Sequence, residues 1–305
     1  MSNDSPDPAA VVELAARHGL TLAVDGITFN EAGLDYRVAF AHEEANFENQ
    51  WVLRMPRRDD VSAKLGEERA ILDFVRPQLP VAVPDWRIQA PELVAYPLLP
   101  GFPGLTLADD GEPVWHFDTA SEPYADSLAR LIAGLHGLNV GQAEAAGIPC
   151  EQPEDVRARW RADLERVCAE FDVSEDLLGG WRAWLADDGL WPTETVFTHG
   201  ELYPAHLLLD EREEIVSVLD WTTAKVSDPA IDFAFHCMFS SADTFERTVA
   251  LYTELTGRIE PRLAERCAAL LSAGPLNYGS YAVVTGNPDH WAAAAEMLNP
   301  ATATE

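Results

Sequence analysis

The chain has 305 residues and a mass of 33.5 kDa, and 47% of its residues are hydrophobic, so it can bury a core in one large domain or two lobes and is neither disordered nor fibrous. It carries 51 acidic and 21 basic residues, for a formal charge of −30 at pH 7. A field of this sign repels nucleic-acid backbones and anionic membranes and gathers small cations, so we expect no nucleic-acid or membrane partner.

The first third of the chain has the pattern of an antiparallel sheet. Short segments rich in β-branched and aromatic residues, separated by turn formers, predict strands over residues 21–29, 34–42, 51–55, 86–89 and 93–96. Two helices interrupt this pattern. One is expected over residues 8–18 and is closed by Gly19, and the other is expected over 62–76, with Ser62 as its N-cap and Pro77 as its stop.

From about residue 101 onward the periodicity becomes helical. Apolar residues recur three and four positions apart over 124–138, 154–171 and 243–255, and Asn287-Pro288 marks a further helix start. A joint rich in Gly and Pro, residues 100–104, separates the two patterns. We therefore expect an α+β protein with the two-lobed, protein-kinase-like order, namely a nucleotide-binding lobe over 1–100 and a larger, mainly helical lobe over 101–305.

Two carboxylates and an imidazole stand out in the second half. Glu201 and His206 lie five residues apart in the loop after His199-Gly200, and a short hairpin that turns at 211–213 returns Asp220 after an apolar strand. Phosphoryl transfer needs a carboxylate that takes the proton of the acceptor hydroxyl, and ligands that hold Mg²⁺ across the nucleotide phosphates. Glu201 fits the base, and His206 and Asp220 fit the metal ligands.

This stretch resembles the aminoglycoside phosphotransferase-like antibiotic kinases, whose loop reads His-Gly-Asp, with Asn or His five positions after the Asp, and whose metal-binding Asp precedes Trp. Within that group, His206 and the run over 220–232 are most similar to the macrolide 2′-phosphotransferases, as are segments 30–35, 52–58 and 80–87. The resemblance implies GTP in preference to ATP, with ATP as the alternative donor, and Mg²⁺ as the metal. It also implies that Asp232 holds the backbone of the catalytic loop.

Glu201 departs from the family, which has aspartate at this position. The extra methylene moves the carboxylate outward by roughly 1 Å, a displacement that costs on the order of 100-fold in rate when the geometry is set for the shorter acid. Either the loop compensates for the longer side chain, or the rate suffers. A nucleotide-binding pseudokinase without turnover is therefore one alternative reading.

The first lobe needs a cation for the nucleotide phosphates and a carboxylate that holds this cation. The only lysines, Lys64 and Lys225, lie outside the predicted strands, so Arg54 on the 51–55 strand is the candidate. Glu68 falls in the middle of the apolar stripe of the 62–76 helix and is the expected partner, with Glu67 as second choice. By the family resemblance, Asp35 belongs to the phosphate loop.

The segment before the joint is the expected hinge against the nucleotide base. Tyr96 lies in this hinge, and because Pro97 cannot donate a backbone hydrogen bond, donation to the base is expected from Leu98 or Leu99.

The acceptor site is expected in the helical lobe, where apolar and aromatic residues can contact a bulky ligand. The candidates are Phe233, Phe235, Met238, Phe239, Leu276, Tyr278 and Tyr281. A macrolide fits such a surface, because its ring needs apolar contact while its amino sugar carries a cation and the hydroxyl to be phosphorylated. The predicted function is a GTP-dependent macrolide 2′-phosphotransferase that inactivates the antibiotic. A kinase for an aminoglycoside or another amino alcohol is the second alternative.

The cysteine spacing and the distribution of apolar residues predict the cellular compartment. The four cysteines are widely spaced and none forms a Cys-x-x-Cys pair, which is typical of a reducing compartment. The first residues lack a basic or apolar leader, and no apolar stretch reaches about 18 residues. We expect a cytoplasmic monomer whose partner is a small molecule.

Overall fold

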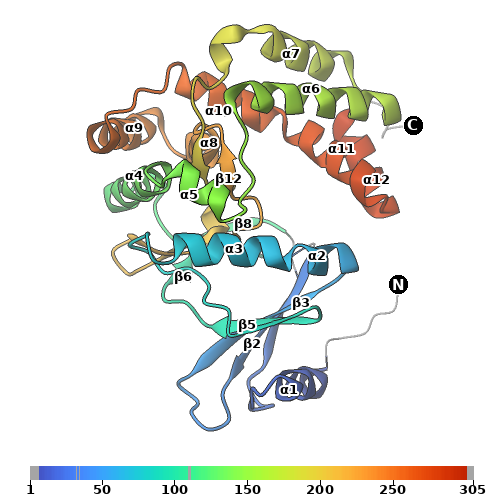
Figure 1. Ribbon diagram of the computed structural model, residues 1–305, viewed down its shortest axis with the longest axis vertical. Helices are drawn as coiled ribbons and strands as arrows, with labels where there is room; N and C mark the ends of the chain where they lie inside the picture. Colours follow the sequence, from blue (N-terminus) through green and yellow to red (C-terminus); the bar gives the residue numbers. More distant parts are fainter. Residues whose placement is uncertain (1–6, 32, 34, 109–110, 301–305) are drawn as a thin grey trace. The chain divides into compact units, whose positions relative to one another are not determined.

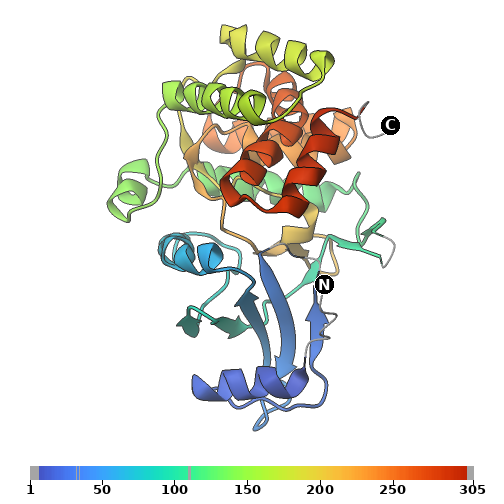
Figure 2. The same cartoon turned by 90° about the vertical axis from the view of Figure 1, so that its right-hand side faces the viewer.

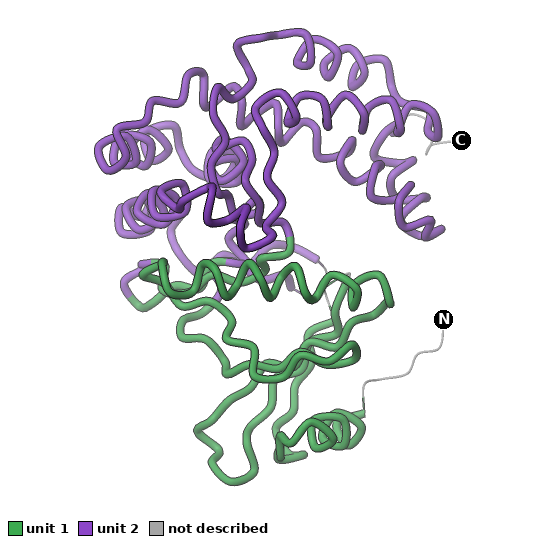
Figure 3. Tube along the Cα trace, in the orientation of Figure 1, with its two compact units in different colours: residues 1–102, 207–211, 215–222 green, residues 103–206, 212–214, 223–305 purple. Residues whose placement is uncertain are grey.

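The computed structural model describes residues 7–31, 33, 35–108 and 111–300, and Figures 1 and 2 show its elements in two views (Figure 1, Figure 2). The chain divides into two compact units (Figure 3). Unit 1 comprises residues 1–102, 207–211 and 215–222, and unit 2 comprises 103–206, 212–214 and 223–305. None of the helices in the described ranges is both long and apolar enough to cross a membrane.

Unit 1 is built on an antiparallel sheet of five strands in the order β1-β2-β3-β5-β4. The strands are β1 (Thr28–Asn30), β2 (Tyr36–His42), β3 (Gln50–Pro56), β4 (Ile88–Ala90) and β5 (Leu93–Pro97). The central strand β3 pairs Arg54 with Val38 on one side and Val94 on the other. The expected strand over 21–29 is interrupted, because Gly26 turns the chain at a φ of 83°: Leu22 forms an isolated bridge with Glu43, and a strand forms again only from Thr28.

Among its described residues, unit 1 has three helices, namely α1 (Pro8–Arg17), α2 (Asp59–Ala63) and α3 (Leu65–Val75). The helix expected over 62–76 is thus two helices that meet at Lys64. Ser62 is not its N-cap, since it lies inside α2 and its hydroxyl donates to the carbonyl of Pro91 at 2.7 Å. The inward face of α3 nevertheless follows the predicted stripe, with Leu65, Glu68, Ile71, Leu72 and Val75 buried.

A later hairpin adds to unit 1, formed by β10 (Leu207–Leu209) and β11 (Ile215–Val218). Ala82 holds β11 through two backbone hydrogen bonds of 2.9 Å, one to the Val216 carbonyl and one from the Val218 amide. A Cβ on Gly101 would lie 2.8 Å from the Val216 side chain, so this position requires glycine at its φ of 98°. These contacts fix the strand from which Asp220 emerges.

Unit 2 is mainly helical. Its helices are α4 (Glu122–His136), α5 (Val140–Ala145), α6 (Pro153–Glu170), α7 (Glu175–Ala186), α8 (Ile231–Phe239), α9 (Ala242–Thr256), α10 (Leu263–Ser272), α11 (Gly274–Thr285) and α12 (Pro288–Leu298), with 3₁₀ turns at Asp188–Leu190 and Pro204–His206. Its strands are β7 (Leu105–Leu107), β8 (Pro113–Trp115), β9 (Val196–Thr198) and β12 (Lys225–Ser227). The two-residue strand β6 (Phe102–Pro103) begins in unit 1. As predicted, Asn287 caps α12 by accepting the Asp289 amide at 2.9 Å.

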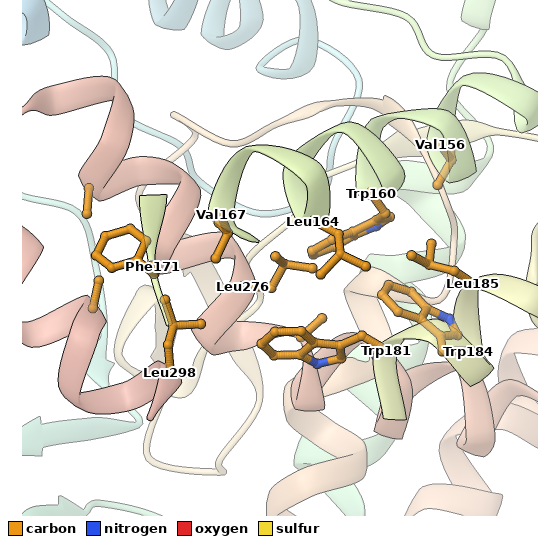
Figure 4. Packing of buried hydrophobic residues seen from close by; sticks show 13 residues of the cluster. Val156, Trp160, Leu164, Val167, Phe171, Trp181, Trp184, Leu185, Leu276 and Leu298 are labelled. Carbon is orange, nitrogen blue, oxygen red and sulfur yellow. The ribbon is translucent and has the colours of Figure 1, made fainter. Parts of the chain in front are cut away.

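The core of unit 2 is a hydrophobic cluster that joins α6 and α7 to the last two helices. Figure 4 shows Trp181 and Trp184 of α7 facing Leu164 of α6 and Leu276 of α11. Leu276 is fully buried in this cluster. Its apolar spacing along the helix is equally consistent with a core position. The cluster stabilises the packing of α6 and α7 against α11 and α12. The catalytic loop is positioned by β9, β12, α4 and α8.

Candidate active site

The catalytic loop follows β9 and is tied to α8. The Asp232 carboxylate on α8 accepts hydrogen bonds from the backbone amides of His199 at 3.1 Å and Gly200 at 2.8 Å. The same carboxylate lies 3.3 Å from His136 Nε2, and both side chains are fully buried. The role that the resemblance implies for Asp232, holding the loop backbone, therefore matches its contacts.

Gly200 is required where the loop bends. Its φ is 87°, and a Cβ there would lie 2.9 Å from the carbonyl oxygen of Thr223. Thr223 closes the bend from the same side, because its hydroxyl donates to the His199 carbonyl at 3.0 Å. A larger residue at position 200 would displace the backbone that carries Glu201.

The backbone of Glu201 connects the two histidines of the loop. Its amide donates to His199 Nδ1 at 3.3 Å, and its carbonyl accepts from His206 Nδ1 at 3.2 Å. Because a carbonyl oxygen only accepts, Nδ1 of His206 is the donor in this bond. The half-buried Glu201 carboxylate also lies near Tyr203, where burial first and this carboxylate second raise the pKa of the phenol.

Asp220 leaves β11 in a strained backbone conformation. Its φ of 56° lies in the left-handed region, which is uncommon for a residue other than glycine and is typical of functional sites. Its carboxylate accepts the Thr222 hydroxyl at 2.6 Å. This local bond fixes the direction of the carboxylate.

Arg54 and Glu68 form the ion pair that the sequence predicts in unit 1. Arg54 Nη1 lies 2.6 Å from Glu68 Oε1, and the two side chains are 9% and 3% exposed. The guanidinium also lies 3.9 Å from the centre of the Tyr36 ring. Glu68 Oε2 is buried and has no hydrogen-bond partner within the described ranges, so the pair retains one unused acceptor.

The pKa values in unit 1 show that Asp220 shares the environment of this pair. Burial raises the pKa of Glu68, and the Asp220 carboxylate adds to this effect while Arg54 opposes it. Burial lowers the pKa of Arg54, but the Glu68 carboxylate and, to a smaller extent, Asp220 raise it overall. Burial likewise raises the pKa of Tyr96 to about 12, with a contribution from Asp220. The metal candidate and the phosphate-binding candidates of unit 1 therefore act on each other electrostatically.

The hinge differs from the prediction at one residue. The amide of Leu98 already donates to the carbonyl of Gln50 at 2.8 Å, so it does not donate to a nucleotide base in this structure, and Leu99 is the remaining candidate. Tyr96 is buried on β5. In the loop over 30–35, residues 32 and 34 lie outside the described ranges, and the Asp35 carboxylate pairs with Arg58 at 2.7 Å.

The acceptor candidates fall into two groups in unit 2. Phe235 and Phe239 on α8 lie near Tyr203, with ring centres 5.1 and 6.1 Å from it, and Met238 is 49% exposed. On α11, Tyr278 is hydrogen-bonded to His290 at 2.9 Å, and Tyr281 packs against the same ring at 5.1 Å.

Two of the remaining apolar candidates are core residues. Leu276 and Phe233 are both fully buried, so neither offers a surface to a ligand. The prediction that Leu276 lines the acceptor site was wrong, because the same apolar spacing on α11 serves the core of unit 2.

Two residues of these sites were missed by the sequence analysis. Tyr203 stands two positions after Glu201, and its ring joins the aromatic group on α8. Tyr36 covers Arg54 from the neighbouring strand. The register places Val38 opposite Arg54 and Tyr36 two residues further along the same face, so a correct alignment of β2 with β3 would have found it.

A family model described as the phosphotransferase enzyme family matches residues 26–268. The chain belongs to this family. It is therefore a phosphotransferase that acts on a hydroxyl group, and the predicted α+β, kinase-like fold is confirmed.

Several relatives share this fold over nearly the whole chain. The chain is 51% identical to the macrolide 2′-phosphotransferase MphH from Brachybacterium faecium, whose crystal structure has a TM-score of 0.88 and covers 96% of this chain and 98% of that one. A macrolide 2′-phosphotransferase type I is 39% identical, with a TM-score of 0.87 and 96% of both chains covered. The uncharacterized protein YcbJ of Bacillus subtilis strain 168 is 36% identical over 293 residues, 94% of each chain.

Proposed function

We propose that the chain is a GTP-dependent macrolide 2′-phosphotransferase. The observation that carries the choice of acceptor is the 51% identity to a macrolide 2′-phosphotransferase over nearly the full length of both chains. The exposed Met238 and the aromatic group of Tyr203, Phe235 and Phe239 supply the apolar surface that a large lactone ring needs. The charge of −30 favours the cationic amino sugar.

The phosphate is transferred to the 2′-hydroxyl of that sugar. Glu201 accepts the proton of this hydroxyl, the sugar oxygen forms a bond to the γ-phosphorus of GTP, and the bond between this phosphorus and the β-phosphate oxygen breaks to release GDP. The hydrogen bonds of the Glu201 backbone to His199 and His206 fix the part of the loop from which the carboxylate extends.

Mg²⁺ would be held by His206 and Asp220. The hairpin register supports this assignment, because Leu207 at the start of β10 pairs with Val218, two residues before Asp220. His206 is the residue bonded to Leu207. Mg²⁺ prefers oxygen ligands, so the Asp220 carboxylate would be its stronger ligand and the His206 imidazole its weaker one. The bound ion would neutralise charge on the β- and γ-phosphates.

Arg54 would bind the α- and β-phosphates. Glu68 holds the guanidinium from one side and Tyr36 covers it, so little side-chain freedom is lost when the phosphate arrives. Tyr96 and Leu99 would contact the base in the hinge, and Asp35 belongs to the phosphate loop. Tyr278 and Tyr281 would extend the acceptor surface.

The test is phosphate transfer by the purified protein. The protein is incubated with magnesium chloride, erythromycin and either GTP or ATP, and the drug is examined by mass spectrometry for one added phosphate. We expect the product with GTP and less of it with ATP. The Glu201→Gln variant should give none, while the matched change Glu211→Gln, at an exposed acid of the hairpin turn, should leave the rate unchanged.

Two results would lead to other functions. Nucleotide binding measured by calorimetry, without transfer to any macrolide or amino alcohol, would identify a pseudokinase. Transfer to kanamycin or another amino alcohol, with none to macrolides, would identify an amino-alcohol kinase. An active Glu201→Gln variant would remove Glu201 as the base.

A further inference from the structure

Unit 2 contains a cavity that the proposed reaction does not use. It has a volume of about 580 Å³ and lies among α8, α9 and α10. Its lining is mostly apolar, including Phe245 and Val249 of α9 and Leu263 of α10, with Glu246 as its charged residue. Cys237, on α8, is part of the wall, so this cavity holds a nucleophile.

A second thiol lies directly behind this wall. Leu263 and Ala264 line the cavity, and Cys267 follows them by four and three residues on α10, so all three share one face of that helix. Cys267 is fully buried, and its thiol points to the Ala230 carbonyl at 3.5 Å. α10 packs against α8, which carries Cys237, and each of the two thiols shifts the pKa of the other. The two thiols are therefore neighbours where α8 and α10 pack together.

The chain has two other cysteines, which differ from this pair. Cys168 is exposed and Cys150 is partly buried, and neither lines the cavity. Burial raises the pKa of both thiols. The neighbouring Cys267, by contrast, lowers the pKa of Cys237 to about 7, which makes Cys237 the more nucleophilic thiol of the pair.

We propose that Cys237 and Cys267 form a dithiol site, reached through the cavity, that neutral apolar disulfides oxidise to an intramolecular disulfide. The Cys237 thiolate attacks one sulfur of the reagent, the sulfur–sulfur bond of the reagent breaks, and one thiolate leaves. Cys267 gives its proton to this leaving group, and its thiolate attacks the Cys237 sulfur, which breaks the mixed disulfide and releases the second half of the reagent as a thiolate. Two protein thiols are oxidised and one reagent disulfide is reduced.

The lining determines the kind of reagent. An apolar wall with one acidic side chain favours an uncharged aromatic molecule, and both Glu246 and the charge of −30 disfavour an anion. The neutral 4,4′-dithiodipyridine is therefore expected to react faster than the dianionic 5,5′-dithiobis(2-nitrobenzoate). The resulting disulfide would join α10 to α8, the helix that carries Asp232.

The test uses the folded protein with Cys150→Ser and Cys168→Ser, so that only the proposed pair is present. With 4,4′-dithiodipyridine we expect two equivalents of thiopyridone, a mass lowered by two hydrogen atoms, and a disulfide-linked peptide pair containing positions 237 and 267. The further change Cys267→Ala should stop the reaction at one equivalent, with the pyridyl group retained on Cys237. The further change Cys237→Ala should slow labelling by at least about tenfold, because Cys267 is fully buried.

Two controls keep the result interpretable. Far-UV circular dichroism shows whether each variant is folded, and Cys267→Val is the second variant if Cys267→Ala unfolds. Ala264→Phe at the rim of the cavity should slow the reaction with 4,4′-dithiodipyridine several-fold, while Ala145→Phe, an exposed alanine on α5, should not. A pyridyl adduct that persists on the protein with both thiols, or equally fast labelling without Cys237, would overturn the proposal.

Discussion

Asp232 and Gly200 are 32 residues apart in the sequence, and the carboxylate Oδ1 of Asp232 accepts the backbone amide of Gly200 at 2.8 Å. The other oxygen of the same carboxylate accepts the amide of His199. One side chain on α8 thus holds two successive amides at the point where the catalytic loop bends. Glu201 is the next residue after Gly200. Its position therefore depends on α8, a helix that is distant from the loop in the sequence.

The first prediction tests this dependence with Asp232→Asn. An amide has one acceptor oxygen instead of two, so one loop amide loses its partner and Glu201 is held less firmly. We expect the rate of phosphate transfer to fall on the order of 100-fold, with the affinity for GTP nearly unchanged. Steady-state kinetics and nucleotide titration measure the two effects. Asp243→Asn, in the first turn of α9, is the matched control and should be fully active. Full activity of Asp232→Asn would show that the tether does not position the loop.

The second prediction concerns the stability of the Arg54–Glu68 pair. Removal of one partner leaves the other charge buried, which typically costs about 3 to 5 kcal/mol in the free energy of unfolding. Arg54→Met and Glu68→Leu should therefore each destabilise strongly, while the double variant should be less destabilised than the sum of both. Urea unfolding followed by fluorescence gives the three values. The exposed Arg17–Glu13 pair, changed in the same way, should show little coupling. Additive losses at positions 54 and 68 would contradict a coupled pair.

The third prediction is a dependence of stability on pH that arises from His236. Burial lowers the pKa of this imidazole to about 4, and its Nε2 is bonded to the Thr248 hydroxyl at 2.8 Å. Between about pH 6.5 and 4, this histidine is protonated in the unfolded chain, where its pKa is near 6.5, but stays neutral in the folded chain. The stability contributed by neutral His236 is thus complete above pH 6.5 and is lost as the pH falls to 4, by about 3 kcal/mol in total.

Chemical unfolding at several pH values checks this effect. The His236→Phe variant keeps an aromatic ring but has no proton to bind, so its free energy of unfolding should fall less between pH 6.5 and 4. His116→Phe, at an exposed histidine bonded to the uncharged Thr106 hydroxyl, should keep the wild-type slope. If His236→Phe has the same slope as the wild type, the acid sensitivity comes from other groups.

The sequence predicted the parts of the fold that local periodicity determines. The helices around α4, α6, α9 and α12 were found within a few residues, because their apolar stripes and caps are local signals. Glu68 could be identified as facing inward by the same argument, and its contact with Arg54 followed from the need of a buried carboxylate for a cation.

The parts that were missed depend on contacts between distant segments. The predicted helix is split at Lys64, and Ser62 bonds to the distant Pro91 carbonyl instead of capping a helix, which no periodicity reveals. The amide of Leu98 is bonded to the Gln50 carbonyl because of the pairing register of β3 and β5. The sequence of either strand alone does not determine this register. Leu276 has the same spacing whether it lines a cavity or fills a core, so only the packing of α6 and α7 against it separates the two cases.

The last prediction addresses the glutamate that stands where the family has aspartate. The loop around Glu201 is held by Asp232, Thr223 and His199, so the backbone cannot easily follow a shorter side chain. In Glu201→Asp the carboxylate should retreat by roughly 1 Å from the acceptor hydroxyl, and we expect the rate of transfer to fall by about 100-fold while the affinity for GTP is retained. Single-turnover kinetics with GTP and erythromycin measure the chemical step directly, and Glu211→Asp in the hairpin turn controls for the loss of a methylene. A faster Glu201→Asp enzyme would mean that the site is still shaped for aspartate, and that the longer acid itself limits the rate of this chain.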